Sequence, residues 1–243
     1  MEQLATHLAE WIAAEVAASG GIGVVYGLSG GIDSAVVAAL AKRAFPHHTL
    51  GVIMPCHSDP RDAEDASVVA HHFDVPATTV DLGPVCDLLL ETLAASSSDL
   101  PDSRLATANL KPRLRMTTLY AFANQLDYRV LGTGNRSELT VGYFTKYGDG
   151  GADFLPLGDL VKGEVRDLAR HLGVPERVIT KPPSAGLWAD QTDEAEMGLT
   201  YEELDAYLLT SEASPAVKAK VDAMHAASEH KRGLPRIASK PGA

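Results

Sequence analysis

The first residues that could do chemistry run from Tyr26 to Ser34, with the sequence Tyr-Gly-Leu-Ser-Gly-Gly-Ile-Asp-Ser. An apolar run, 22–26, precedes the glycines and an Ala/Val-rich segment follows them, which predicts a strand, a tight turn and a helix. This arrangement presents backbone N–H groups and a helix N-terminus to an anion. The carboxylate of Asp33 would repel a phosphate there unless a divalent cation lay between them. The run therefore predicts a site for a metal–phosphate ligand.

The same loop differs from two common nucleotide-binding motifs. It has no Gly-Lys-Ser/Thr ending, so it is not the loop that holds a transferring γ-phosphate. After Gly21 and Gly23, Tyr26 stands where a dinucleotide-binding loop needs glycine. A tight turn without a ligand is the simplest alternative. The run Ser-Gly-Gly-x-Asp-Ser instead resembles the pyrophosphate loop of N-type ATP pyrophosphatases, which cleave ATP between the α and β phosphates.

A second group of polar side chains lies just past another expected strand end, in the run 132–138. Glu138 could bracket a Mg²⁺ ion with Asp33, because this cation usually takes one or two carboxylates together with phosphate oxygens. A solvated loop glutamate is the alternative.

The run 142–153 is a third dense group, with three aromatic residues within five positions. The aromatic rings could stack on flat ligand rings, or they could pack in a satellite of the core. The charged residues of the run are Lys146, Asp149 and Asp153.

Three basic residues stand at the beginnings of expected helices. Pro112 suits the first turn of one of them. Arg113 and Arg115 are two positions apart and face different sides of that helix. The sequence does not decide whether one arginine points inward or both form an exposed basic start of the helix.

Lys162 begins a later helix, where the helix dipole disfavours a cation. It suits that position better if it meets phosphates, so Lys162→Ala should leave thermal stability level or slightly higher.

The elements that must position these residues alternate between strands and helices. Strands are expected at 21–27, 49–54, 77–80 and 128–132, and helices at 1–20, 33–45, 61–73, 84–96, 109–127, 162–172, 200–209 and 215–230. Such alternation predicts an α/β fold, with a Rossmann-like parallel sheet and helices on both faces. The loops after the strands should then meet at one edge. The segments 97–108, 148–151 and 181–192 are expected to be loops, the last two long enough to act as lids.

The bulk composition narrows the possible classes of function. The 243 residues favour a single domain over 1–243, with a flexible tail at 233–243. A net charge of −11 weighs against nucleic acid and anionic membranes as partners. No signal peptide and no long apolar run is visible, so a cytoplasmic location is expected. Cys56 and Cys86, without a CxxC pair, indicate neither a disulfide framework nor a zinc site.

Taken together, the motifs resemble those of ammonia-dependent NAD⁺ synthetases, and they follow the family order from about residue 22 to residue 236. The matching segments are 28–34, 109–116, 132–138, 142–153, 156–162, 181–188, 191–194 and 229–232. The block 132–162 is the most specific. Arg136 and the pair Ala189-Asp190 stand where many relatives have Lys and an acidic residue with Gly.

The resemblance implies roles for individual residues. Mg²⁺ would be bound by Asp33 and Glu138. ATP, the co-substrate, would be held by Gly27, Leu28, Ser29, Gly30, Gly31, Ile32, Asp33, Ser34, Thr133, Lys162 and Ser184. Deamido-NAD⁺ would be bound by Arg113, Lys146, Asp153, His230 and Lys231, the last two reaching the second subunit of a homodimer. The catalytic residues would be Lys162 and Asp149, the latter positioning ammonia.

The implied reaction is the amidation of deamido-NAD⁺ to NAD⁺. The nicotinate carboxylate attacks the α-phosphorus of ATP, pyrophosphate departs, and ammonia attacks the acyl-adenylate to release AMP. No glutaminase region is visible, so free ammonia is the expected donor. Two other classes compete with this interpretation. A tRNA-modifying ATP pyrophosphatase is opposed by the acidic charge and the lack of paired catalytic cysteines. A non-catalytic adenine-nucleotide-binding module would not need the Asp33–Glu138 pair or the run 142–153.

Overall fold

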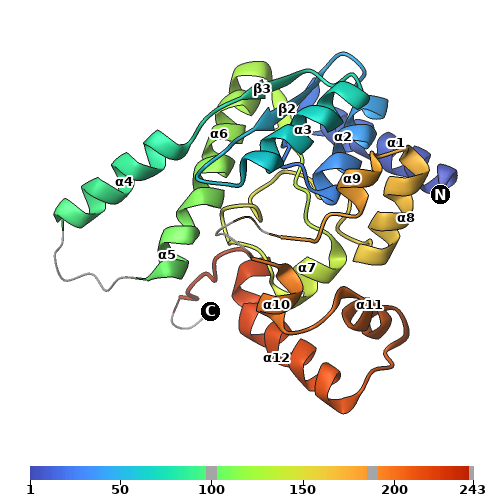
Figure 1. Ribbon diagram of the computed structural model, residues 1–243, viewed down its shortest axis with the longest axis vertical. Coiled ribbons are helices and arrows are strands. Elements are labelled where there is room, and N and C mark those ends of the chain that lie inside the picture. The colour runs from blue at the N-terminus through green and yellow to red at the C-terminus, as the bar shows by residue number, and fades with distance from the viewer. Residues whose placement is uncertain (97–102, 185, 187–190, 241–243) are drawn as a thin grey trace.

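The computed structural model describes residues 1–96, 103–184, 186 and 191–240, and a parallel sheet lies at its centre (Figure 1). The strands are β1 (Gly23–Gly27), β2 (Thr49–Ile53), β3 (Ala77–Thr79) and β4 (Tyr128–Val130). Their order in the sheet is β3-β2-β1-β4, and every pairing is parallel. The predicted α/β class is confirmed, and the loops after β1 and β4 lie side by side because those strands are neighbours.

Helices cover both faces of the sheet, as the alternation predicts. Val24 and Tyr26 of β1 join one apolar cluster, whereas Val25 points to the opposite face and joins another, as side-chain alternation along a strand requires. The first face packs against α1 (Glu2–Ala18), α2 (Ile32–Ala44), α3 (Pro60–His72), α8 (Lys162–Leu172) and α9 (Glu176–Ile179). The second packs against α4 (Gly83–Ser96) and α6 (Leu110–Leu126).

A third apolar cluster builds the lower part of the molecule in Figure 1. Its helices are α7 (Arg136–Val141), α10 (Asp193–Met197), α11 (Tyr201–Thr210) and α12 (Pro215–Arg232). Tyr201 and Leu204 are fully buried in it. This cluster places α7 and the end of α12 around the same cavity as the glycine-rich run 27–34, which is called the phosphate loop after its expected ligand.

The structure corrects the expected elements where helices are short. The expected loop 97–108 contains α5 (Arg104–Ala108), and its residues 97–102 lie outside the described part. Glu138 lies on α7 and not on a loop. The helices α9 and α10 were not predicted, because four or five residues are too few to show a period. Residues 185 and 187–190 of the expected lid lie outside the described part.

Two other expectations concern the cysteines and the tail. Cys56 and Cys86 are free and buried, in agreement with a packing role. Residues 234–240 form neither helix nor strand and are exposed. None of the helices in the described part combines the length and hydropathy needed to cross a bilayer.

Candidate active site

The glycine-rich run forms a tight connection between β1 and α2. Gly30 has a φ of +79°, and a Cβ there would lie 2.3 Å from the backbone oxygen of Asp62 on α3. Only glycine fits such a position, because any side chain would meet backbone that cannot move away. The loop is therefore pressed against the N-terminal part of α3, and its shape is fixed before a ligand arrives.

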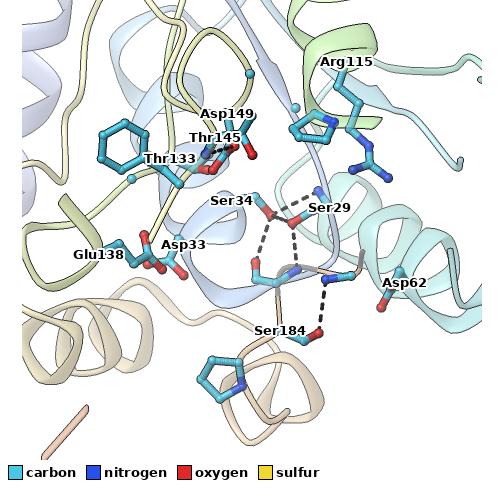
Figure 2. Close-up of a pocket in the computed structure, with 18 of the residues that line it drawn as sticks. Ser29, Asp33, Ser34, Asp62, Arg115, Thr133, Glu138, Thr145, Asp149 and Ser184 are labelled. Carbon is cyan, nitrogen blue, oxygen red and sulfur yellow. Dashed lines mark hydrogen bonds between the residues drawn. The ribbon is translucent and has the colours of Figure 1, made fainter. Parts of the chain in front are cut away.

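The two serines of the loop hold it in this shape (Figure 2). Ser34 Oγ donates to the Gly31 carbonyl at 2.9 Å and accepts the Ser29 N–H at 3.2 Å. Ser29 Oγ accepts the Gly31 N–H at 3.2 Å and lies 3.1 Å from Ser34 Oγ. These contacts place both hydroxyls at the start of α2, where the helix N-terminus favours an anion.

Lys162 lies between the two carboxylates that were predicted to bind metal. Its Nζ is 2.5 Å from Asp33 Oδ2 and 3.2 Å from Glu138 Oε1. Only 2% of the Lys162 side chain is exposed, and 16% of each carboxylate. Asn135 completes the group, because its Nδ2 donates to Asp33 Oδ1 at 2.8 Å. Lys162 is therefore not a solvated surface residue, and the alternative of a solvated glutamate at position 138 is wrong.

The structure also explains how a lysine can begin α8. Asp205 on α11 accepts the Gly163 N–H at 2.7 Å and the Ser137 hydroxyl at 2.5 Å. Ser137 Oγ in turn accepts the Lys162 N–H at 3.1 Å. The carboxylate of Asp205 thus supplies the negative charge that the helix N-terminus favours. The ammonium group of Lys162 is free to extend away from the helix toward Asp33.

The electrostatics of this group show an excess of negative charge. Burial raises the pKa of Glu138 to about 7, and the Lys162 charge opposes part of that shift. Burial disfavours the charged form of Lys162, but Asp33 and Glu138 outweigh it and hold the lysine pKa above its usual value. A third buried carboxylate, Asp193, accepts the Tyr201 hydroxyl at 3.0 Å on Oδ2, while its Oδ1 has no hydrogen-bond partner.

These residues fit a divalent cation. Three carboxylates surround one ammonium group, and one carboxylate oxygen lacks a partner, so an added positive charge would be favourable. The described residues contain no cluster of three or more His, Cys, Asp or Glu placed to hold a metal ion by themselves. A cation held by two carboxylates and completed by ligand oxygens matches the usual environment of Mg²⁺.

A single cavity of about 1500 Å³ joins the phosphate loop to the later motifs. The predicted residues that line it are Gly27, Leu28, Ser29, Gly31, Ile32, Asp33, Ser34, Arg113, Thr133, Glu138, Lys146, Asp149, Lys162, Ser184, His230 and Lys231. Ser184 is exposed and its Oγ accepts the Gly186 N–H at 3.1 Å. The volume exceeds the roughly 300–1,000 Å³ of sites that hold drug-sized ligands, so there is room for a larger ligand.

The end of α12 closes one side of this cavity within the same chain. Lys231 Nζ donates to the backbone oxygens of Gly142 and Phe144, each at 2.8 Å. Lys146 Nζ donates to the backbone oxygen of His230. His230 and Lys231 therefore line the cavity of their own chain, so a second subunit is not needed to bring them to a cavity.

The two aspartates of the run 142–153 occupy different places. Asp149 opens onto the cavity, and its Oδ1 accepts the Thr145 N–H at 2.9 Å. Desolvation by the surrounding protein raises the pKa of Asp149. Backbone hydrogen bonds and the charges of Lys231 and Arg115 oppose this upward shift. Asp153 lies outside the cavity lining: its carboxylate accepts the Val130 N–H at 2.8 Å and the Tyr120 hydroxyl at 3.1 Å.

Sequence reasoning did not find an ion-pair cluster beside the phosphate loop. Lys181 Nζ lies 2.7 Å from both Asp62 Oδ1 and Asp65 Oδ2, and Arg177 also pairs with Asp65. These pairs fasten the start of the segment 181–184 to α3 just where Gly30 packs. Three acidic residues spaced at 59, 62 and 65 are an ordinary pattern for the start of a helix, so the sequence alone gave no signal.

Known proteins match this chain over nearly its whole length. The chain matches the NAD synthase family over residues 4–235. The NH(3)-dependent NAD(+) synthetase of Carboxydothermus hydrogenoformans is 50% identical over 236 residues, which is 97% of each chain. A structure of NMN synthetase from Francisella tularensis superposes with a TM-score of 0.91 at 37% identity, covering 99% of this chain and 98% of that one.

A second solved structure gives the same result. The NH3-dependent NAD synthetase of Campylobacter jejuni has a TM-score of 0.80 at 30% identity, with 98% of both chains covered. The family match over residues 4–235 spans the phosphate loop, Lys162 and the end of α12. The chain that carries them belongs to the NAD synthase family.

Proposed function

We propose that the protein joins ammonia to the nicotinate carboxylate of deamido-NAD⁺, using ATP and releasing NAD⁺, AMP and pyrophosphate. One observation carries the proposal: a buried lysine and two carboxylates lie beside a preformed phosphate loop, in a cavity that extends to the aromatic run 142–147. A non-catalytic nucleotide-binding module would have no use for a buried group of this charge.

The first step forms a bond between a carboxylate oxygen and the α-phosphorus, and breaks the bond from that phosphorus to pyrophosphate. The backbone N–H groups of the loop, with Ser29 and Ser34, would hold the departing pyrophosphate. Lys162 would turn from Asp33 toward the phosphates and neutralise their charge. Asp33 and Glu138 would hold Mg²⁺, which supplies charge neutralisation on the polyphosphate.

The second step breaks the acyl–oxygen bond as ammonia attacks the acyl carbon. Asp149 would position the nucleophile, because its carboxyl opens onto the cavity and can accept a hydrogen bond from ammonia. Arg113, Lys146, His230 and Lys231 would contact deamido-NAD⁺ on the same side. Thr133 and Ser184 would contact ATP. The segment 181–184, tied to α3 by Lys181, would limit the access of water that could hydrolyse the adenylate.

A second candidate product is NMN, because the Francisella tularensis structure with the TM-score of 0.91 bears the name NMN synthetase. The same carboxylate would then be amidated on the mononucleotide. Steady-state assays with deamido-NAD⁺ and nicotinate mononucleotide, each with ammonium or glutamine, separate the possibilities. We expect the higher kcat/KM for deamido-NAD⁺ and activity with ammonium only. A higher kcat/KM for the mononucleotide would transfer the assignment to NMN synthesis.

We also propose a homodimer in the cytoplasm. Four apolar side chains of α4 and α5, on helices that project from the body in Figure 1, are exposed: Val85, Leu88, Leu93 and Leu105. Exposed apolar faces of this kind are typical of subunit interfaces. Analytical ultracentrifugation of Leu88→Glu and of the parent protein tests this proposal. We expect the parent protein to sediment as a dimer and the variant as a monomer. A parent protein that sediments as a monomer would contradict the proposal.

A further inference from the structure

Arg115 is a cation of the cavity to which the family resemblance assigns no role. It lies one turn into α6, and its Nε donates to the backbone oxygen of Met54 at 3.1 Å. Its Nη2 donates to Ser58 Oγ at 3.0 Å. Met54 and Ser58 follow β2, the strand next to the one that carries the phosphate loop. The guanidinium is thereby fixed at the sheet edge, and Figure 2 shows it extending toward the cavity.

The charge of Arg115 has no carboxylate partner within ion-pair distance in the described part of the chain. Asp59 pairs with Arg61 at 2.5 Å, and Asp62 pairs with Lys181 at 2.7 Å. Desolvation lowers the pKa of the Arg115 guanidinium, which reflects surroundings that disfavour its charge. A desolvated arginine without a counterion is unfavourable by itself, so an anionic ligand would remove that cost.

The donors that remain suit a phosphate. A guanidinium has five N–H groups, and the two bonds above leave Nη1 and one hydrogen of Nη2. This pair can donate two parallel bonds to two oxygens of one phosphate, a geometry in which arginine exceeds lysine. Arg113, two residues away, is exposed and makes one long bond of 3.4 Å to the Lys146 backbone oxygen, so it is not held in this way.

The position of Arg115 indicates which phosphate it would meet. In Figure 2, Ser29 and Ser34 lie between the Asp33–Glu138 pair and Arg115. The departing pyrophosphate would occupy the loop, so the α-phosphate lies beyond it, at the end where the attacking carboxylate arrives. Arg115 is on that side: it lines the same cavity as Asp149, and in Figure 2 both residues lie above Ser29 and Ser34.

We propose that Arg115 binds the α-phosphate of ATP and keeps hold of it in the acyl-adenylate and AMP. The proposal rests on the adenylation step of the proposed function. It assigns to this chain a phosphate contact separate from the pyrophosphate loop. Arg115 would be a catalytic residue, since the oxygens that it binds belong to the phosphorus under attack.

Binding of AMP and adenosine tests the proposal without turnover. Isothermal titration of the parent protein should give a clear preference for AMP over adenosine. In Arg115→Met the ratio of the affinities for AMP and adenosine should fall by about 10- to 100-fold, as expected for the loss of charge-assisted hydrogen bonds. Adenosine and pyrophosphate should bind as they do to the parent. Arg113→Met removes the same charge from the same helix and should keep the preference for AMP.

Several outcomes would overturn the assignment. Equally weakened binding of AMP and adenosine would mean that Arg115 only supports the fold. Weakened binding of pyrophosphate alone would place Arg115 beside the departing pyrophosphate. An unchanged preference for AMP in Arg115→Met, or no preference in the parent, also contradicts it. If the methionine variant does not fold, Arg115→Lys takes its place and should keep only part of the preference. Because AMP binding requires no amidation, a failed NAD⁺ assay and a failed AMP test are separate results.

Discussion

Lys162 Nζ lies 2.5 Å from Asp33 Oδ2, inside the pair of carboxylates expected to hold a metal. The ammonium group of Lys162 and a divalent cation cannot both lie between these two carboxylates, because two positive charges so close together repel strongly. If Asp33 and Glu138 hold Mg²⁺ as proposed, Lys162 would have to move away from them when metal and ATP bind. Its movement toward the phosphates would couple occupancy of the metal site to neutralisation of the nucleotide.

Replacement of the lysine should have two opposite effects. Lys162→Ala should slow adenylation, measured as pre-steady-state release of pyrophosphate, while binding of Mg²⁺ without nucleotide becomes tighter. The sequence-based expectation of level or slightly higher thermal stability is revised, because breaking a buried ion pair costs about 3–5 kcal/mol. Urea unfolding should show that loss, with partial recovery in Mg²⁺. Lys162→Arg should restore the rate only in part. Weaker Mg²⁺ binding in the alanine variant would contradict the account.

Asp33 should be needed for metal more than for folding. Asp33→Asn keeps the size of the side chain but removes an anionic ligand, so we expect Mg²⁺-dependent turnover to fall by orders of magnitude. Rates measured over a range of Mg²⁺ concentrations give the apparent affinity, and circular dichroism checks the fold. Activity close to that of the parent at limiting Mg²⁺ would rule out the metal role.

Two glycines with the same φ of +79° allow a matched comparison at the phosphate loop. At Gly173 a Cβ would meet nothing within 4 Å, whereas at Gly30 it would lie 2.3 Å from the Asp62 oxygen. Gly173→Ala should cost only the backbone strain, about 1–2 kcal/mol. Gly30→Ala should cost more and weaken pyrophosphate binding, measured by calorimetry. Similar behaviour of the two variants would show that the loop can adapt to a side chain.

Metal binding should depend on pH through Glu138. Burial raises the pKa of this carboxyl from 4.5 to about 7. In the metal-free protein it favours folding when protonated, and that contribution is lost as the pH rises from about 4.5 through about 7. Mg²⁺ binds the ionised form, so the rise in Tm caused by Mg²⁺ should be larger at pH 8 than at pH 6. Glu138→Gln is the control and should remove most of this difference. An equal rise at both pH values in the parent would contradict the assignment.

The sheet and the phosphate loop could be predicted because their signals are local. β1 is an apolar run, the paired glycines Gly30 and Gly31 come three residues after its end, and the alternation of elements indicates a parallel sheet. The burial of Lys162 could not be read from the sequence, since it depends on Asp205 of α11 and on the packing of α7. The choice between Arg113 and Arg115 depends in the same way on Met54 and Ser58, which are distant along the chain.

The places of the two aspartates in the run 142–153 could not be predicted from the sequence. The motif 142–153 suggested two aspartates in one site, but the folded chain uses the Asp153 carboxylate to bind the Val130 N–H and Tyr120. A run of glycines gives no period from which to predict where each side chain points. Only the tertiary contacts separate Asp149, which faces the cavity, from Asp153.

The proposed amidation is tested most directly by following the carboxylate oxygens. Deamido-NAD⁺ with both carboxylate oxygens replaced by ¹⁸O is incubated with ATP, Mg²⁺ and ¹⁵N-ammonium, and the masses of the products are measured by mass spectrometry. Attack on the α-phosphorus followed by amidation predicts one ¹⁸O in AMP, and one ¹⁸O together with one ¹⁵N in NAD⁺. Label in pyrophosphate, or AMP without label, would contradict the account.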